Sequence, residues 1–180
     1  MTVALANPKI RLGPIGKKIA ILLAGAAAIF LLVVPINAAR FVWNTSQSAP
    51  TGIYWIDQGR WDVGERVAVR PSRELAIDLD ARGILPSGKL LIKRIAAGEG
   101  DRVCRLSDAI SINGFWVVSA KTSTSTGAKL PAWEGCQVLS AGDVFLLGDT
   151  ANSYDGRYFG VTHQNEILGQ VTLVLSLQKP

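Results

Sequence analysis

The chain has 180 residues, which is enough for one domain with a sizeable hydrophobic core. Its formal net charge is +5, but four of its 19 basic residues lie among the first 18 positions, which leaves 15 basic against 14 acidic residues in the rest. A chain with this balance has no basic stripe for DNA or RNA, so we expect no nucleic acid among its partners.

The N-terminal segment is typical of a membrane anchor. Residues 1–18 form a basic tail without an acidic residue, and residues 19–39 carry no charge. About 20 apolar residues cross a bilayer as a helix, and the positive-inside rule places the basic tail in the cytoplasm. We therefore expect a single transmembrane helix over 19–39 in the inner (cytoplasmic) membrane, with residues 40–180 exported to the periplasm. The four cations of the tail are Lys9, Arg11, Lys17 and Lys18.

A cleaved secretory signal is the alternative, because Ala38 and Ala39 loosely resemble a small-residue processing site. The apolar stretch is longer than the apolar region of most signal peptides, which favours a retained span. The basic tail would then lie against anionic membrane lipid, which accounts for the high isoelectric point.

The segment after residue 52 reads as short strands separated by turns. Few of its runs have helical periodicity, so we expect one mainly β domain. Asn113-Gly114 is the strongest hairpin signal, because both residues tolerate the positive φ of a type I′ turn. Residues 74–88 could form a helical turn before Pro86. The polar residues 120–135 are typical of a loop at the surface. The β-like runs are GIYWI, ERVAVR, KLLIKRI, DRVCRL, AISING, FWVVSA, DVFLLG and ILGQVTLVLSL.

Cys104 and Cys136 both fall in the predicted exported part. Two cysteines in an oxidising compartment are compatible with one disulfide, and two buried free thiols are the alternative. Two distant cysteines and a single histidine, His163, give poor support for a metal site. We expect neither a metal nor an organic cofactor.

In the stretch NTSQSAPTGIYW, residues 44–55, three of the four positions 45–48 before Pro50 are hydroxyl residues. A serine nucleophile needs a base within hydrogen-bond reach, and His163 lies in a polar run that is more typical of the surface. Lys93 is a better candidate, because in a strand it shares one face with Leu91 and Ile95, and burial lowers the pKa of a lysine. The alternative is an edge-strand lysine that discourages aggregation.

Three segments resemble, in order, the conserved boxes of type I signal peptidases, which use a Ser/Lys dyad. IKRIAAGEGDRV (92–103) resembles the lysine box, and GDTANSYDGRYFG (148–160) resembles the C-terminal box. SAPTGIYW (48–55) resembles the serine box in the shortened form of the conjugative-transfer branch, the TraF type. The similarity extends from about residue 17 to about residue 175.

The resemblance implies a role for each matching residue. Ser48 matches the nucleophile, Lys93 the general base, and Ser46 the position whose hydroxyl helps the Ser48 backbone N–H to form the oxyanion hole. From the C-terminal box, Ser153 is expected to hydrogen-bond the Lys93 amine. The positions expected to orient the lysine and brace the site are Gly148, Asp149, Ser153, Asp155 and Arg157, with Asp155 and Arg157 as an ion pair.

The resemblance also implies a fold and a function. The fold is a mainly β, signal-peptidase-like domain that follows one N-terminal transmembrane helix. The function is that of a membrane-anchored serine endopeptidase that removes leader peptides from exported proteins. In the conjugative branch the substrate is a pilin precursor, which is hydrolysed or joined into a ring. The alternatives are a housekeeping signal peptidase of broad specificity and a non-catalytic, pilin-binding component of a secretion assembly.

Overall fold

The computed structural model describes residues 13–33 and 40–177, and the chain divides into two units, Met1–Ala38 and Ala39–Pro180. In the first unit, helix α1 covers Pro14–Val33, with a proline at its first position, where a missing N–H costs nothing. The helix therefore starts before the predicted residue 19, and residues 34–39 of the predicted span lie outside the described residues. In the described part of the chain, no helix is both long and apolar enough to cross a membrane.

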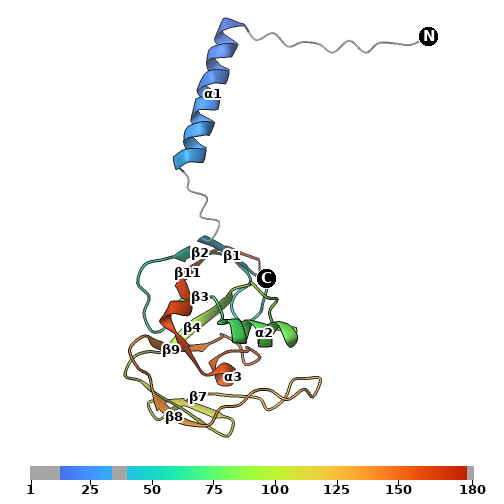
Figure 1. Cartoon of the computed structure of the whole chain (residues 1–180), viewed down its shortest axis with the longest axis vertical. Helices are drawn as coiled ribbons and strands as arrows, with labels where there is room; N and C mark the ends of the chain where they lie inside the picture. The colour runs from blue at the N-terminus through green and yellow to red at the C-terminus, as the bar shows by residue number, and fades with distance from the viewer. Residues whose placement is uncertain (1–12, 34–39, 178–180) are drawn as a thin grey trace, which may run out of the picture. The chain divides into compact units, whose positions relative to one another are not determined.

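The second unit is mainly β, as predicted, and its larger sheet has seven antiparallel strands (Figure 1). The strand order is β1-β2-β11-β3-β4-β9-β10, so the C-terminal strand β11 lies in the middle, between β2 and β3. The bounds are β1 Phe41–Asn44, β2 Gly52–Asp57, β11 Ile167–Ser176, β3 Arg66–Val69, β4 Leu91–Ala97, β9 Asp143–Leu147 and β10 Val161–His163.

A second sheet of four strands has the order β7-β6-β5-β8, and Figure 1 shows it at the end of the domain opposite β1 and β2. Its strands are β5 Arg102–Leu106, β6 Ala109–Ile112, β7 Phe115–Ser119 and β8 Gly135–Val138. Asn113 and Gly114 both have positive φ, 53° and 85°, and they join β6 to β7. The predicted type I′ hairpin is thus confirmed.

Short helical elements complete the described part of the domain. Helix α2 covers Arg73–Ala81, and the Ser72 side chain caps it by accepting a hydrogen bond from the backbone of Leu75. The helical turn predicted before Pro86 is therefore a nine-residue helix. Helix α3 covers Gly156–Phe159, and the 3-10 helix η2 covers Gln164–Glu166.

Strand β4 runs through the hydrophobic core and carries Lys93 at its centre. Lys93 pairs with Val67 of β3, while Leu91 and Ile95 belong to one buried cluster with residues of β3, α2 and β9. Because alternate residues of a strand point to the same face, Lys93 lies on the same face as Leu91 and Ile95, inside the domain as expected. Strand β4 lies between β3 and β9, so it is not an edge strand. The alternative that Lys93 discourages aggregation at a sheet edge is therefore wrong.

Cys104 of β5 and Cys136 of β8 are directly opposite each other in the smaller sheet and form a disulfide. The bridge ties the edge strand β8 to the rest of the sheet and closes a loop with a sequence separation of 32.

We expect this disulfide to stabilise the domain by about 3–4 kcal/mol, because closing a loop of this length restricts the unfolded chain. Denaturant unfolding of the wild-type protein and of a Cys104→Ser/Cys136→Ser variant measures the difference. Maleimide labelling of both thiols in unreduced, denatured protein would contradict the pairing.

Candidate active site

The serine-rich loop lies between β1 and β2, and the buried side chain of Asn44 organises it. Its amide nitrogen donates hydrogen bonds to the carbonyls of Ser46, Ala49 and Pro50 at 3.0–3.1 Å. Its oxygen accepts the backbone N–H of Ser46 at 3.1 Å. The Tyr54 hydroxyl holds the same loop by donating to the Pro50 carbonyl. One buried side chain therefore fixes the path of the backbone through both candidate catalytic serines.

Ser46 and Ser48 lie side by side on this loop. Their hydroxyl oxygens are 2.8 Å apart, and the backbone N–H of Ser48 donates to the Ser46 hydroxyl at 3.4 Å. The structure thus brings together the hydroxyl and the N–H that the resemblance assigns to the oxyanion hole. The Ser48 carbonyl accepts the backbone N–H of Asp149, which joins this loop to the segment after β9.

The Lys93 amine is buried, with only 2% of the residue exposed, and it donates a hydrogen bond to the Ser153 hydroxyl at 2.7 Å. Burial lowers the pKa of Lys93 from 10.5 to about 8. The Asp155 carboxylate opposes this shift, the Arg157 guanidinium adds to it, and Asp149 opposes it. The predicted contact between Lys93 and Ser153 is present.

The segment from Gly148 to Arg157 forms a tight loop around a buried ion pair. The Arg157 guanidinium lies 2.7 Å from the Asp155 carboxylate, and both side chains are almost fully buried. Asp155 also accepts the backbone N–H of Gly148 and caps α3 at Arg157. Arg157 donates to the carbonyls of Thr150 and Ala151. This pair therefore braces the loop that carries Ser153, as expected, and its buried charges are compensated by hydrogen bonds.

Gly148 allows Ser153 to approach the site. A Cβ atom at this position would lie 2.0 Å from the Ser153 hydroxyl oxygen and 3.2 Å from the Ser48 carbonyl. Any side chain there would push Ser153 away from the Lys93 amine, so the glycine is required by packing.

The side chain of Asp149 contacts two arginines, although the resemblance places this residue among those that orient Lys93 and brace the site. Its carboxylate pairs with Arg66 at 2.6 Å and with Arg94 at 3.4 Å. Ser153 rather than Asp149 hydrogen-bonds the Lys93 amine. The backbone of Asp149 supports the Ser48 loop, and its side chain joins β3 and β4 beside the site.

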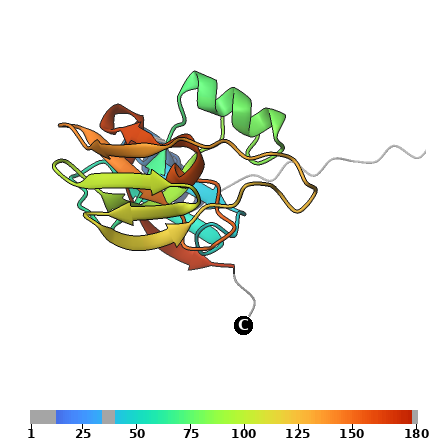
Figure 2. The same cartoon turned by 90° about the horizontal axis from the view of Figure 1, so that it is seen from below.

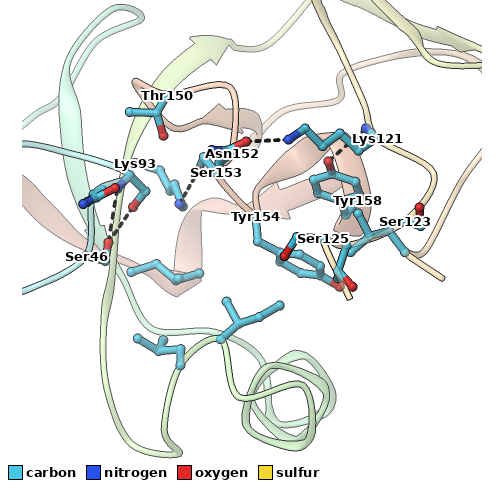
Figure 3. A pocket seen from close by; sticks show the side chains of 17 residues that line it. Ser46, Lys93, Lys121, Ser123, Ser125, Thr150, Asn152, Ser153, Tyr154 and Tyr158 are labelled. Atoms are coloured by element: carbon cyan, nitrogen blue, oxygen red, sulfur yellow. Dashed lines mark hydrogen bonds between the residues drawn. The ribbon is translucent and has the colours of Figure 1, made fainter. Parts of the chain in front are cut away.

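One cleft of about 690 Å³ is lined by Ser46, Ser48, Lys93 and Ser153. Figure 3 shows Ser46, Lys93 and Ser153 at one side of it and Lys121, Ser123 and Ser125 at the other. Its apolar lining comes from Ile84, Leu85, Leu91, Leu130, Tyr154 and Tyr158. Such a cleft has room for a peptide and offers a hydroxyl, a lysine amine and an N–H donor to it.

Within residues 13–33 and 40–177, no group of three or more His, Cys, Asp or Glu side chains is arranged to hold a metal ion.

A serine hydroxyl and a buried lysine in one cleft are features of a serine peptidase. The chain belongs to the signal peptidase family, peptidase S26, whose sequence model matches residues 15–176. The family inferred from the three boxes is thus confirmed.

Several relatives are named for plasmid or conjugal transfer. The plasmid transfer protein TraF of Escherichia coli is 32% identical over 159 residues, which cover 82% of this chain and 88% of that protein. The conjugal transfer protein TraF of Agrobacterium fabrum is 34% identical over 138 residues, which cover 70% and 77%. A crystal structure of a signal peptidase I from Enterococcus faecalis aligns with a TM-score of 0.38 and 21% identity, over 64% of this chain and all of that one.

Asn44 is the site residue that sequence reasoning missed. It opens the quoted stretch NTSQSAPTGIYW, but an asparagine before a polar loop indicates no more than an Asx turn. Only the structure shows that its amide reaches across the loop to Ala49 and Pro50.

We expect Asn44→Ala to lower kcat by about 10- to 10²-fold with little change in KM, because the loop that aims Ser48 loses its tether. The same change should cost about 1–3 kcal/mol of stability, since buried carbonyls lose their donor. Asn44→Asp should be at least as damaging, because a carboxylate would face these carbonyl oxygens. Steady-state kinetics and denaturant unfolding measure both effects, and an unchanged kcat in both variants would rule out this positioning role.

Proposed function

We propose that this protein is a membrane-anchored serine endopeptidase with a Ser48/Lys93 dyad, and that it processes the precursor of a conjugative pilin. The burial of Lys93 in the cleft that Ser48 lines carries the proposal. A lysine with a pKa of about 8 is partly neutral near physiological pH, so it can accept a proton. The two relatives named for plasmid and conjugal transfer support the choice of substrate.

In this proposal, the Ser48 hydroxyl turns from Ser46 to Lys93 and attacks the scissile carbonyl while the amine takes its proton. The backbone N–H of Ser48 and the Ser46 hydroxyl stabilise the oxyanion. Lys93 then returns the proton to the leaving amine, which gives an acyl-enzyme. The acyl group is the part of the substrate on the N-terminal side of the scissile bond, because the C-terminal part has left as the amine. Attack by water releases the acyl part as a free acid, and attack by its own N-terminal amine joins its ends into a ring.

We also propose that the N-terminal segment anchors the domain in the cytoplasmic membrane, with the catalytic domain on the periplasmic side. The support comes from the uncharged stretch 19–39 and the basic tail before it. Phe41 and Trp43 of β1 are 55% and 69% exposed, as expected of aromatic residues at a membrane interface. Membrane fractionation and protease protection in spheroplasts would test both the anchoring and the orientation.

Incubation of the purified, detergent-solubilised protein with a pilin precursor, followed by intact-mass measurement, tests the activity. A shortened product indicates hydrolysis, and a further loss of one water from the shortened product indicates cyclisation. An unchanged mass would contradict the proposed enzyme and favour a binding role. Cleavage of unrelated exported precursors at the same rate would point to a housekeeping signal peptidase. Ser48→Ala protein serves as the inactive control.

A further inference from the structure

The cleft continues beyond the candidate catalytic groups to a hairpin formed by residues 121–130. A β-bridge between Ser123 and Lys129 holds the hairpin together, and the backbone N–H of Thr124 donates to the Ala128 carbonyl. It projects from the body of the domain beside α2 (Figure 2), and Arg82 at the end of that helix donates to the Lys129 carbonyl. The first arm of the hairpin lines the cleft.

Lys121, at the base of this hairpin, is held at both its backbone and its amine. Its backbone N–H donates to the Tyr158 hydroxyl at 3.0 Å, and its amine donates to the Asn152 side chain at 2.6 Å, as Figure 3 shows. Tyr158 is itself buried and stacked on Tyr154, with ring centroids 5.0 Å apart. The amine of Lys121 is therefore positioned at the wall of the cleft instead of moving freely in solvent.

The charge of the cleft is one-sided. Its lining includes two lysines, Lys93 and Lys121, and no aspartate or glutamate. In the described part of the chain, no carboxylate lies within ion-pair distance of Lys121. An ammonium has three donors, and Asn152 accepts one of them. The remaining donors suit an anionic group with several acceptor oxygens, and the hydroxyl residues Ser123 and Ser125 line the same cleft.

We propose that Lys121 forms a subsite for a carboxylate of the peptide substrate, which is either an acidic side chain or the peptide's C-terminal carboxylate. Apolar side chains line the cleft as well, among them Leu85, Leu91 and Leu130, and in this proposal they accept uncharged residues of the peptide. Because Lys121 lies across the cleft from Lys93 (Figure 3), the carboxylate lies away from the scissile bond. This inference rests on the proposed function, because it deepens the specificity of the same site.

The test measures binding separately from cleavage. The labelled peptides have alanine at the first and third positions before the scissile bond. In the first set, each of the other positions in turn carries Glu or Gln. In the second set, the peptide ends in a free acid or an amide. Affinity for the Ser48→Ala protein is measured by fluorescence anisotropy. Glu at one position, or the free acid, should bind about fivefold more tightly than its neutral partner, as is typical of a partly exposed charged hydrogen bond. Added salt should reduce this preference.

Matched variants in the same background assign the preference to Lys121. Lys121→Met should abolish it, and Lys121→Arg should retain it. Lys129→Met, on the opposite arm of the hairpin and outside the cleft lining, should leave it unchanged. Equal affinities within every peptide pair, or an unchanged preference in Lys121→Met, would overturn the subsite. Wild-type protein that cleaves none of the peptides would instead contradict the proposed function, because the binding assay needs no cleavage.

Discussion

Alanine in place of Ser48 should reduce cleavage of a pilin precursor by about 10⁵-fold or more, because no other group then forms the acyl-enzyme. The fold should remain intact. The hydroxyl of Ser48 contacts that of Ser46 in a partly exposed loop, and the backbone links of the loop to Asn44 and Asp149 do not involve it. Intact-mass measurement of the product and thermal unfolding of the variant check the two parts. Normal processing by Ser48→Ala would end the proposal.

Ser46→Ala separates the two serines. It keeps the nucleophile but removes the hydroxyl that lies 2.8 Å from it, so we expect a loss of about 10²-fold, typical of one oxyanion-hole donor. A loss larger than that of Ser48→Ala would exchange the two roles. A silent Ser46→Ala would leave the backbone N–H of Ser48 as the main donor.

The second large effect concerns Lys93 and its dependence on pH. With a pKa of about 8, about one lysine in ten is neutral at pH 7, whereas at the ordinary value of 10.5 the neutral fraction is below about one in a thousand. Only the neutral amine accepts the Ser48 proton. The cleavage rate should therefore rise with pH and level off above about pH 8. A rate that falls over this range, or that is still rising tenfold per unit at pH 10, would contradict the role of Lys93.

Variants of Lys93 should confirm that this titration belongs to the base. Lys93→Arg should be inactive, because a guanidinium stays protonated at every accessible pH. Lys93→Met should also be inactive although it fits the apolar neighbours Leu91 and Ile95. Lys89→Ala is the matched control, since Lys89 is exposed and lies in the turn before β4. Loss of activity confined to Lys89→Ala would show that Lys89, and not Lys93, is the base.

Local sequence patterns were enough to predict several elements. The alternation around Lys93 predicts a strand with Leu91, Lys93 and Ile95 on one face, and the Asn113-Gly114 pair predicts its hairpin, because both signals depend on neighbours within a few residues. The three boxes likewise predicted the family and the contact of Ser153 with Lys93, and Ser48 lines the same cleft as that lysine.

Contacts between distant segments depended on the tertiary structure. The fold brings the β1–β2 loop, β4 and the loop after β9 to one cleft, and no periodicity reports such pairings. That packing produces the hydrogen bonds of Asn44 across its loop and the ion pairs of Asp149 with Arg66 and Arg94. It also produces the hydrogen bond from Lys121 to Asn152. Residue type and local spacing by themselves determined which groups are capable of the chemistry. The folded chain decided which of them meet, because a hydrogen bond needs its two atoms within about 3 Å whatever their separation in sequence.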